Sequence, residues 1–199
     1  MIAKTVERME QLIDNVRVMM MAETMPSRVQ KFALKELVNR AIAKAKSQTL
    51  DPAVRVGVRH PQEPLVVVAD PLIEHALAEI ARECMRQERA DIARLNIDVK
   101  PDYEINTVRI EFISFSPVQD PTIKESLLEW HSPGALPGES LSLPLAKTII
   151  EKSGGEVTVQ DRIPGRPEEG IKFVVTLPVE QGEIENHHGG ESSFVSGIT

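Results

Sequence analysis

Two glutamates on a predicted helix have the type and spacing to do chemistry in this chain. Glu79 and Glu83 lie one helical turn apart within the helix expected at 72–88. A carboxylate oxygen can ligate Mg²⁺ or accept a proton as a general base. Arg82 and Arg86 follow each glutamate by three residues, a spacing that is also typical of ion pairs on a solvated helix face. Ion pairing is the simpler interpretation of this spacing.

Other catalytic and metal-binding patterns are missing from the sequence. His60, His75 and His131 have no cysteine or histidine at metal-ligand spacing, which argues against a zinc site. His75 is expected on a helix surface. The only cysteine, Cys84, falls on the apolar side of helix 72–88 and is expected to be a buried, inert thiol. No nucleophile elbow, P-loop or dinucleotide fingerprint occurs.

The composition is that of an ordinary globular protein with an acidic balance. The 199 residues are 41% hydrophobic and 27% charged, with a formal net charge of −7. That charge and the single Trp and Tyr argue against nucleic-acid binding, which needs a basic face and stacking aromatics. No apolar run approaches the roughly 20 residues that cross a bilayer. We therefore expect a cytoplasmic protein without a membrane span.

The N-terminal residues 1–24 are predicted to form a helix with one apolar stripe. Its members recur every three or four residues, as in a coiled-coil seam: Ile2, Val6, Met9, Ile13, Val16 and Met20. An isolated helix of this length is marginal in water, so the stripe needs a partner. We expect a homodimer through residues 1–24 or contact with a neighbouring segment. Packing of the helix onto its own domain is the alternative.

Helical and strand patterns alternate along the rest of the chain. Helices are expected at 32–45, 72–88, 122–130 and 143–152, and strands at 54–59, 65–69, 92–99, 107–115, 155–160 and 171–177. This order predicts an α/β fold, a two-layer sandwich of one mixed sheet with helices on one face. The expected organisation is a helix at 1–25, a folded domain at 28–181 and a disordered tail at 182–199.

Several sequence segments, taken in their order along the chain, resemble the dimerisation and ATP-binding regions of sensor histidine kinases. Residues 5–15, Thr-Val-Glu-Arg-Met-Glu-Gln-Leu-Ile-Asp-Asn, are similar to the second helix of the kinase dimerisation hairpin. Residues 32–42 resemble the first catalytic-domain helix, and residues 67–77 the strand and entry to the asparagine-box helix. Residues 138–155 resemble the second glycine box and its helix. The resemblance covers roughly residues 3–181 and implies a gyrase-type ATPase fold after a dimerisation-type helix.

The resemblance also implies which residues would act, and several are replaced here. Glu83 takes the position of the asparagine that binds Mg²⁺, and Glu79 that of the general base in gyrase-type relatives. The kinase phosphoacceptor is a histidine on the first dimerisation helix. Residues 1–24 match the second helix and contain no histidine, so either this chain is a fragment of a longer protein or it does not autophosphorylate by that route.

The two glycine boxes of the implied ATP site differ from the family pattern at most of their positions. Ser114 stands where the family has an aspartate that binds adenine, which removes a charge-assisted hydrogen bond. Serine or valine stands at most of the glycine positions, where a Cβ makes positive φ costly and keeps a ligand away from the backbone. The implied ATP-site positions are Glu83, Ser114, Ser116, Val118, Gly138, Ser140, Ser142 and Lys147.

These replacements predict a degenerate histidine-kinase-like module, a pseudokinase of two-component signal transduction. It would act through protein contacts, as a homodimer that meets a response regulator or a partner kinase, and no cofactor is expected. The first alternative is an active divergent kinase or ATPase that binds ATP and Mg²⁺ through Glu83, with Glu79 as base. The second is an anti-sigma-type protein that sequesters a partner and shares the fold.

Overall fold

The computed structural model describes residues 2–24, 29–49, 54–86, 93–115, 124, 126–130 and 141–180. The helices are α1 (Ile2–Thr24), α2 (Leu34–Ser47), α3 (Ile73–Arg86) and α5 (Ser142–Lys152). The strands are β1 (Gln30–Ala33), β2 (Val54–Arg59), β3 (Val66–Ala69), β4 (Ala93–Asp102), β5 (Thr107–Ser114), β6 (Glu156–Ile163) and β7 (Arg166–Pro178).

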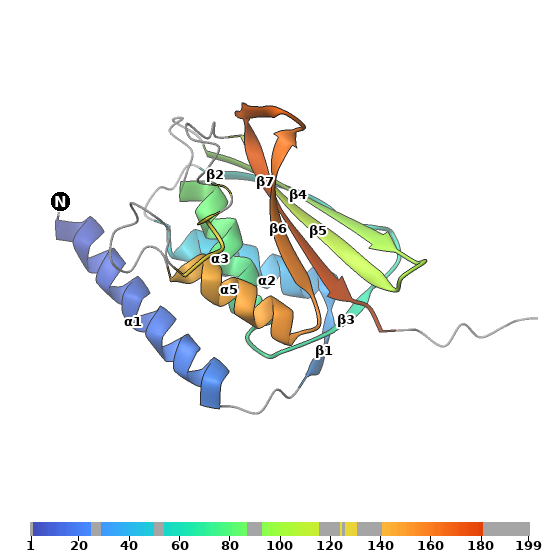
Figure 1. Cartoon of the computed structure of the whole chain (residues 1–199), viewed down its shortest axis with the longest axis horizontal. Helices are drawn as coiled ribbons and strands as arrows, with labels where there is room; N and C mark the ends of the chain where they lie inside the picture. The colour runs from blue at the N-terminus through green and yellow to red at the C-terminus, as the bar shows by residue number, and fades with distance from the viewer. Residues whose placement is uncertain are drawn as a thin grey trace, which may run out of the picture.

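A five-stranded sheet in the order β2-β4-β5-β7-β6 forms one layer of the molecule. Strand β2 runs parallel to β4, whereas the other neighbours are antiparallel, so the sheet is mixed. Figure 1 shows α2, α3 and α5 together against one face of this sheet. Strands β4, β5 and β7 turn alternate apolar residues toward the helices, among them Ile97, Phe112 and Phe173, all fully buried. The predicted two-layer sandwich is confirmed.

A second sheet of two strands lies beside the main one and was not predicted. Strands β1 and β3 pair antiparallel, with Phe32 opposite Val67. The sequence pattern placed Phe32 inside a helix, but the helix begins at Leu34. The prediction was wrong by two residues because the partner strand of β1 lies far along the chain, where a local pattern cannot reveal it.

Helix α3 lies at the centre of the core. It starts where expected, since the Asp70 carboxylate accepts a hydrogen bond from the amide of Leu72 at 2.9 Å. Its inner face includes Leu77 and Ile80, both fully buried. Cys84 is also fully buried, and burial raises the pKa of its thiol well above the ordinary value. The prediction of a buried, unreactive cysteine is consistent with this position.

Helix α1 lies on the outside of the helical layer, away from the sheet, and contacts α5 (Figure 1). It packs through Asn15, Val18 and Ala22, which are buried. The predicted apolar stripe points outward instead, with exposed fractions of 38–67% among its described side chains: Val6, Met9, Ile13, Val16 and Met20. The side chain of Ile2 lies outside the described residues. Helix α1 therefore packs on its own domain, as the alternative interpretation had it, and still leaves its stripe uncovered.

Candidate functional site

A cluster of polar side chains fills the junction of α1, α3 and α5. We name it the helix-junction cluster, and it consists of Gln11, Asn15, Glu79, Arg82 and Ser142. Gln11 and Asn15 come from the face of α1 that is opposite its apolar stripe. Glu79 and Ser142 come from the asparagine-box and second-glycine-box positions of the sequence. The cluster thus joins the implied general base, Glu79, and one implied ATP-site position, Ser142, to the N-terminal helix.

Glu79 is fully buried at the centre of this cluster. One of its carboxylate oxygens, Oε2, accepts hydrogen bonds from Arg82 Nη2 at 2.5 Å and from Gln11 Nε2 at 2.9 Å. The predicted pairing of Glu79 with Arg82 is confirmed, but the predicted solvated helix face is wrong. The reason is tertiary, because α1 covers this side of α3.

Ser142 accepts hydrogen bonds from two neighbouring elements. Its hydroxyl oxygen lies 2.9 Å from Asn15 Nδ2, 3.2 Å from Arg82 Nη2 and 3.5 Å from Gln11 Nε2. Ser142 is the first residue of α5, so the three donors converge on a helix N-terminus. A glycine at this position would offer none of these contacts. The serine that replaces a glycine of the implied ATP site therefore anchors α1.

Three buried polar atoms of the cluster have no hydrogen-bond partner among the described residues. They are Asn15 Oδ1, Glu79 Oε1 and Arg82 Nε. A buried polar atom left without a partner costs about 1–3 kcal/mol. The cluster is therefore polar and incompletely satisfied, unlike the apolar core beside it.

The comparisons with known proteins agree on the fold. No family model matches the sequence. The sensor protein KdpD of Escherichia coli (strain K12) is 28% identical over 162 residues, which make up 78% of this chain and 17% of KdpD. The catalytic domain of the histidine kinase ThkA superposes with a TM-score of 0.64 and 20% identity, over 76% of this chain and 95% of that one. Full-length ShkA in complex with AMPPNP superposes with a TM-score of 0.63 and 14% sequence identity. That match covers 88% of this chain and 37% of the ShkA chain.

The chain has the fold of a histidine kinase catalytic domain. Within this fold, Glu83 lies one turn after Glu79 on α3 and is 9% exposed. No group of three or more His, Cys, Asp or Glu residues able to hold a metal ion occurs among the residues that the structure describes. The metal role of Glu83 stays a prediction that no contact tests.

The remaining implied ATP-site positions are spread over the histidine kinase fold. Ser114 is fully buried at the end of β5, and a Cβ at Gly170 on β7 would overlap its carbonyl oxygen. Lys147 Nζ lies 3.0 Å from a carboxylate oxygen of Glu129, an ordinary surface ion pair. Ser116, Val118, Gly138 and Ser140 lie outside the described residues. Among the described contacts, the structure brings the implied general base Glu79 together with one implied ATP-site position, Ser142, through Gln11 and Arg82.

His75 lies next to the cluster and is buried, not on the surface as predicted. Its Nδ1 is 3.0 Å from Lys44 Nζ and 3.8 Å from a carboxylate oxygen of Asp14. Burial lowers the pKa of His75, and Lys44 and Arg82 lower it further, although Glu79 and Asp14 oppose them. The neutral ring accepts from Lys44, and α1 again provides part of the cover.

Gln11 and Asn15 are the site residues that sequence reasoning missed. Together with Val18 and Ala22 they recur at the same three- and four-residue spacing as the apolar stripe. This second stripe lies on the opposite face of α1 and is small or polar, so hydrophobicity alone did not reveal it. Its regular spacing was the signal that could have found it.

Proposed function

We propose that this chain is a degenerate histidine-kinase-like signalling module that acts through protein contacts, with little or no binding of ATP. The observation that carries the proposal is the engagement of Glu79 and Ser142 by α1. A nucleotide phosphate placed at this junction would have to displace Gln11 and Asn15. It would also compete with the carboxylate of Glu79 for the guanidinium of Arg82, and the two anions repel each other at short range.

The exposed stripe of α1 supports the proposal of a homodimer. Met9 and Ile13 are 60% and 67% exposed, and contiguous apolar surface of this kind is typical of an interaction site. Beside the C-terminal half of the stripe, Met19, Trp130 and Leu145 line a hollow of about 250 Å³ that can accept a partner side chain. A second copy of α1 would cover the stripe, and a response regulator or a partner kinase would receive the signal.

Nucleotide titration tests the loss of ATP binding. We expect no saturable heat in calorimetry and no rise of the unfolding temperature with millimolar Mg-ATP. A ligand that binds only the folded state at a hundredfold excess over its dissociation constant would stabilise by about 2.7 kcal/mol. ShkA, which was solved with AMPPNP, is the positive control.

A saturable ATP isotherm would contradict the proposal and support an active kinase or ATPase instead. The double variant Gln11→Ala/Asn15→Ala refines this test, because it removes the side chains of α1 from the junction. If this variant bound ATP and the wild type did not, α1 would be blocking an otherwise intact site. Association with a sigma factor in place of a receiver domain would favour the anti-sigma alternative.

A further inference from the structure

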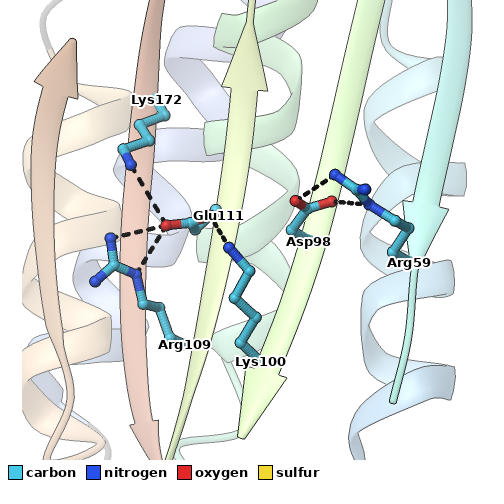
Figure 2. A network of polar contacts seen from close by, with 6 residues as sticks. All are labelled: Arg59, Asp98, Lys100, Arg109, Glu111 and Lys172. Carbon is cyan, nitrogen blue, oxygen red and sulfur yellow. Dashed lines mark hydrogen bonds and ion pairs between the residues drawn. The ribbon is translucent and has the colours of Figure 1, made fainter. Parts of the chain in front are cut away.

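The open face of the five-stranded sheet carries a network of charged side chains. Figure 2 shows this network in front of the strands, with the helices behind. Arg59 on β2 forms two hydrogen bonds with Asp98 on β4, each of 2.7 Å. Glu111 on β5 accepts from Lys100 at 2.8 Å and lies 2.7 Å from Arg109 Nη2. Lys172 on β7 approaches the same carboxylate at 3.5 Å.

The carboxylates of this network lie beneath the cations. The side chains of Asp98 and Glu111 are 10% and 6% exposed, whereas those of Arg59, Lys100 and Arg109 are 78%, 58% and 42% exposed. Asp98 and Glu111 are also direct partners in the register of β4 and β5. Two like charges at opposed positions are unfavourable unless cations surround them. The network therefore presents its positive groups to solvent.

More basic residues extend this surface toward the other end of β2. Arg55 and Arg94 are exposed and are partners in the register of β2 and β4. We name the whole surface the basic sheet face, and it comprises Arg55, Arg59, Arg94, Lys100, Arg109 and Lys172. Asp102 and Glu156 lie at its borders. The six basic residues outnumber the two buried carboxylates and the two acidic residues at the borders. This face is therefore positive, although the whole chain has a net charge of −7.

We propose that the basic sheet face is the docking surface for an acidic partner protein, one that presents several carboxylates together. This inference rests on the proposed function through protein contacts and assigns that function a surface. Asp98 and Glu111 hold the cations in place before binding, which reduces the entropy lost on association. From Arg59 to Lys172 the face spans three strand spacings, about 14 Å, which matches a few carboxylates on one helix or strand.

A protein partner fits this face better than a nucleic acid does. Phe115, an aromatic ring at the end of this face, is already covered by the guanidinium groups of Arg94 and Arg162, each 4.9 Å from its centroid, so it is not a free platform on which bases could stack. The remainder of the chain is acidic and would repel a long polyanion that extends past the patch. A compact acidic surface meets only the patch, because charges further than about 8–10 Å are screened at physiological salt.

The test uses the full chain and a fluorescein-labelled peptide of about six alternating glutamates and serines, with fluorescence anisotropy at about 50 and 300 mM NaCl. A lysine-serine peptide and a short single-stranded DNA are the comparison probes. We expect the glutamate peptide to bind at low salt, the lysine peptide not to bind, and the DNA to bind more weakly than the glutamate peptide.

Charge reversal locates the binding surface. Arg59→Glu/Lys100→Glu should weaken glutamate-peptide binding by about tenfold or more. Lys35→Glu/Lys46→Glu, which changes the net charge equally on the exposed side of α2, should leave binding within about twofold. Arg59→Gln/Lys100→Gln provides a milder variant if reversal unfolds the sheet.

Three results would overturn the inference: no binding of the glutamate peptide, equal weakening by both charge reversals, or tighter binding of DNA. None of them depends on nucleotide titration, which tests the proposed function separately. If the chain bound both Mg-ATP and the glutamate peptide, the proposal of a degenerate ATP site would be rejected, whereas the proposed docking surface would stand.

Discussion

At the scale of single residues, Glu111 is a buried carboxylate that three neighbouring cations influence. Burial by itself would raise its pKa, but the hydrogen bond from Lys100 and the charges of Lys172, Lys100 and Arg109 outweigh burial. The pKa of Glu111 therefore lies below the ordinary 4.5. A lowered pKa contributes stability above the unfolded value, and that stability is lost as the pH falls through the folded value.

Glu111→Gln should accordingly reduce the free energy of unfolding by about 1–3 kcal/mol at neutral pH, because three cations lose their shared partner. The difference from the wild type should shrink once the pH falls below 4.5. Urea unfolding at neutral pH and near pH 3 measures both effects. Glu156→Gln, at an exposed position of β6, is the control and should change stability by less than about 0.5 kcal/mol. An undiminished difference in acid would contradict the assignment.

At the scale of elements, α1 has an exposed apolar face and a polar face, and the polar face attaches it to the domain. Asn15→Ala removes the 2.9 Å hydrogen bond to Ser142 and should cost about 1–2 kcal/mol. Hydrogen exchange should become faster across α1 while the strands keep their protection, since only the docking of α1 is weakened. Glu10→Ala, at an exposed position of α1, should leave exchange unchanged. Uniform acceleration across the whole chain would point to global destabilisation instead.

The apolar face of α1 gives a separate prediction about assembly. Met9→Glu/Ile13→Glu places charges on the exposed stripe and should convert the proposed homodimer to a monomer in sedimentation velocity, with the fold intact by circular dichroism. The matched control is Tyr103→Glu/Ile105→Glu, which alters two side chains that are 64% and 65% exposed in the β4–β5 turn. A wild-type chain that is already monomeric would reject the homodimer.

At the scale of the whole molecule, the buried core of the described residues ends at Leu177 on β7. Removal of residues 182–199 should therefore leave the unfolding temperature within about 2 °C of the full chain. Truncation after Thr176 removes fully buried Leu177 and should lower stability by about 2–5 kcal/mol. A large effect of the shorter truncation would mean that the predicted domain boundary at 181 is misplaced.

No helix of the described ranges is long and apolar enough to cross a membrane, as the sequence predicted. The alternation of apolar residues likewise predicted the strands and helices of the main layers, because burying one face of a strand or helix needs only a local pattern. The entry to α3 and the burial of Cys84 followed from equally local signals, an Asp-Pro pair and an apolar helix face.

The sequence by itself determined the two-layer α/β fold, the apolar stripe of α1 and which residues stand at the implied ATP-site positions. Only the tertiary structure decided which face of α1 meets the domain, and with it the burial of Glu79 and His75. It also paired β1 with β3 and set Asp98 opposite Glu111. The physical reason is that such contacts join segments distant in the chain, where the energy of a polar group depends on the neighbours that the fold brings to it.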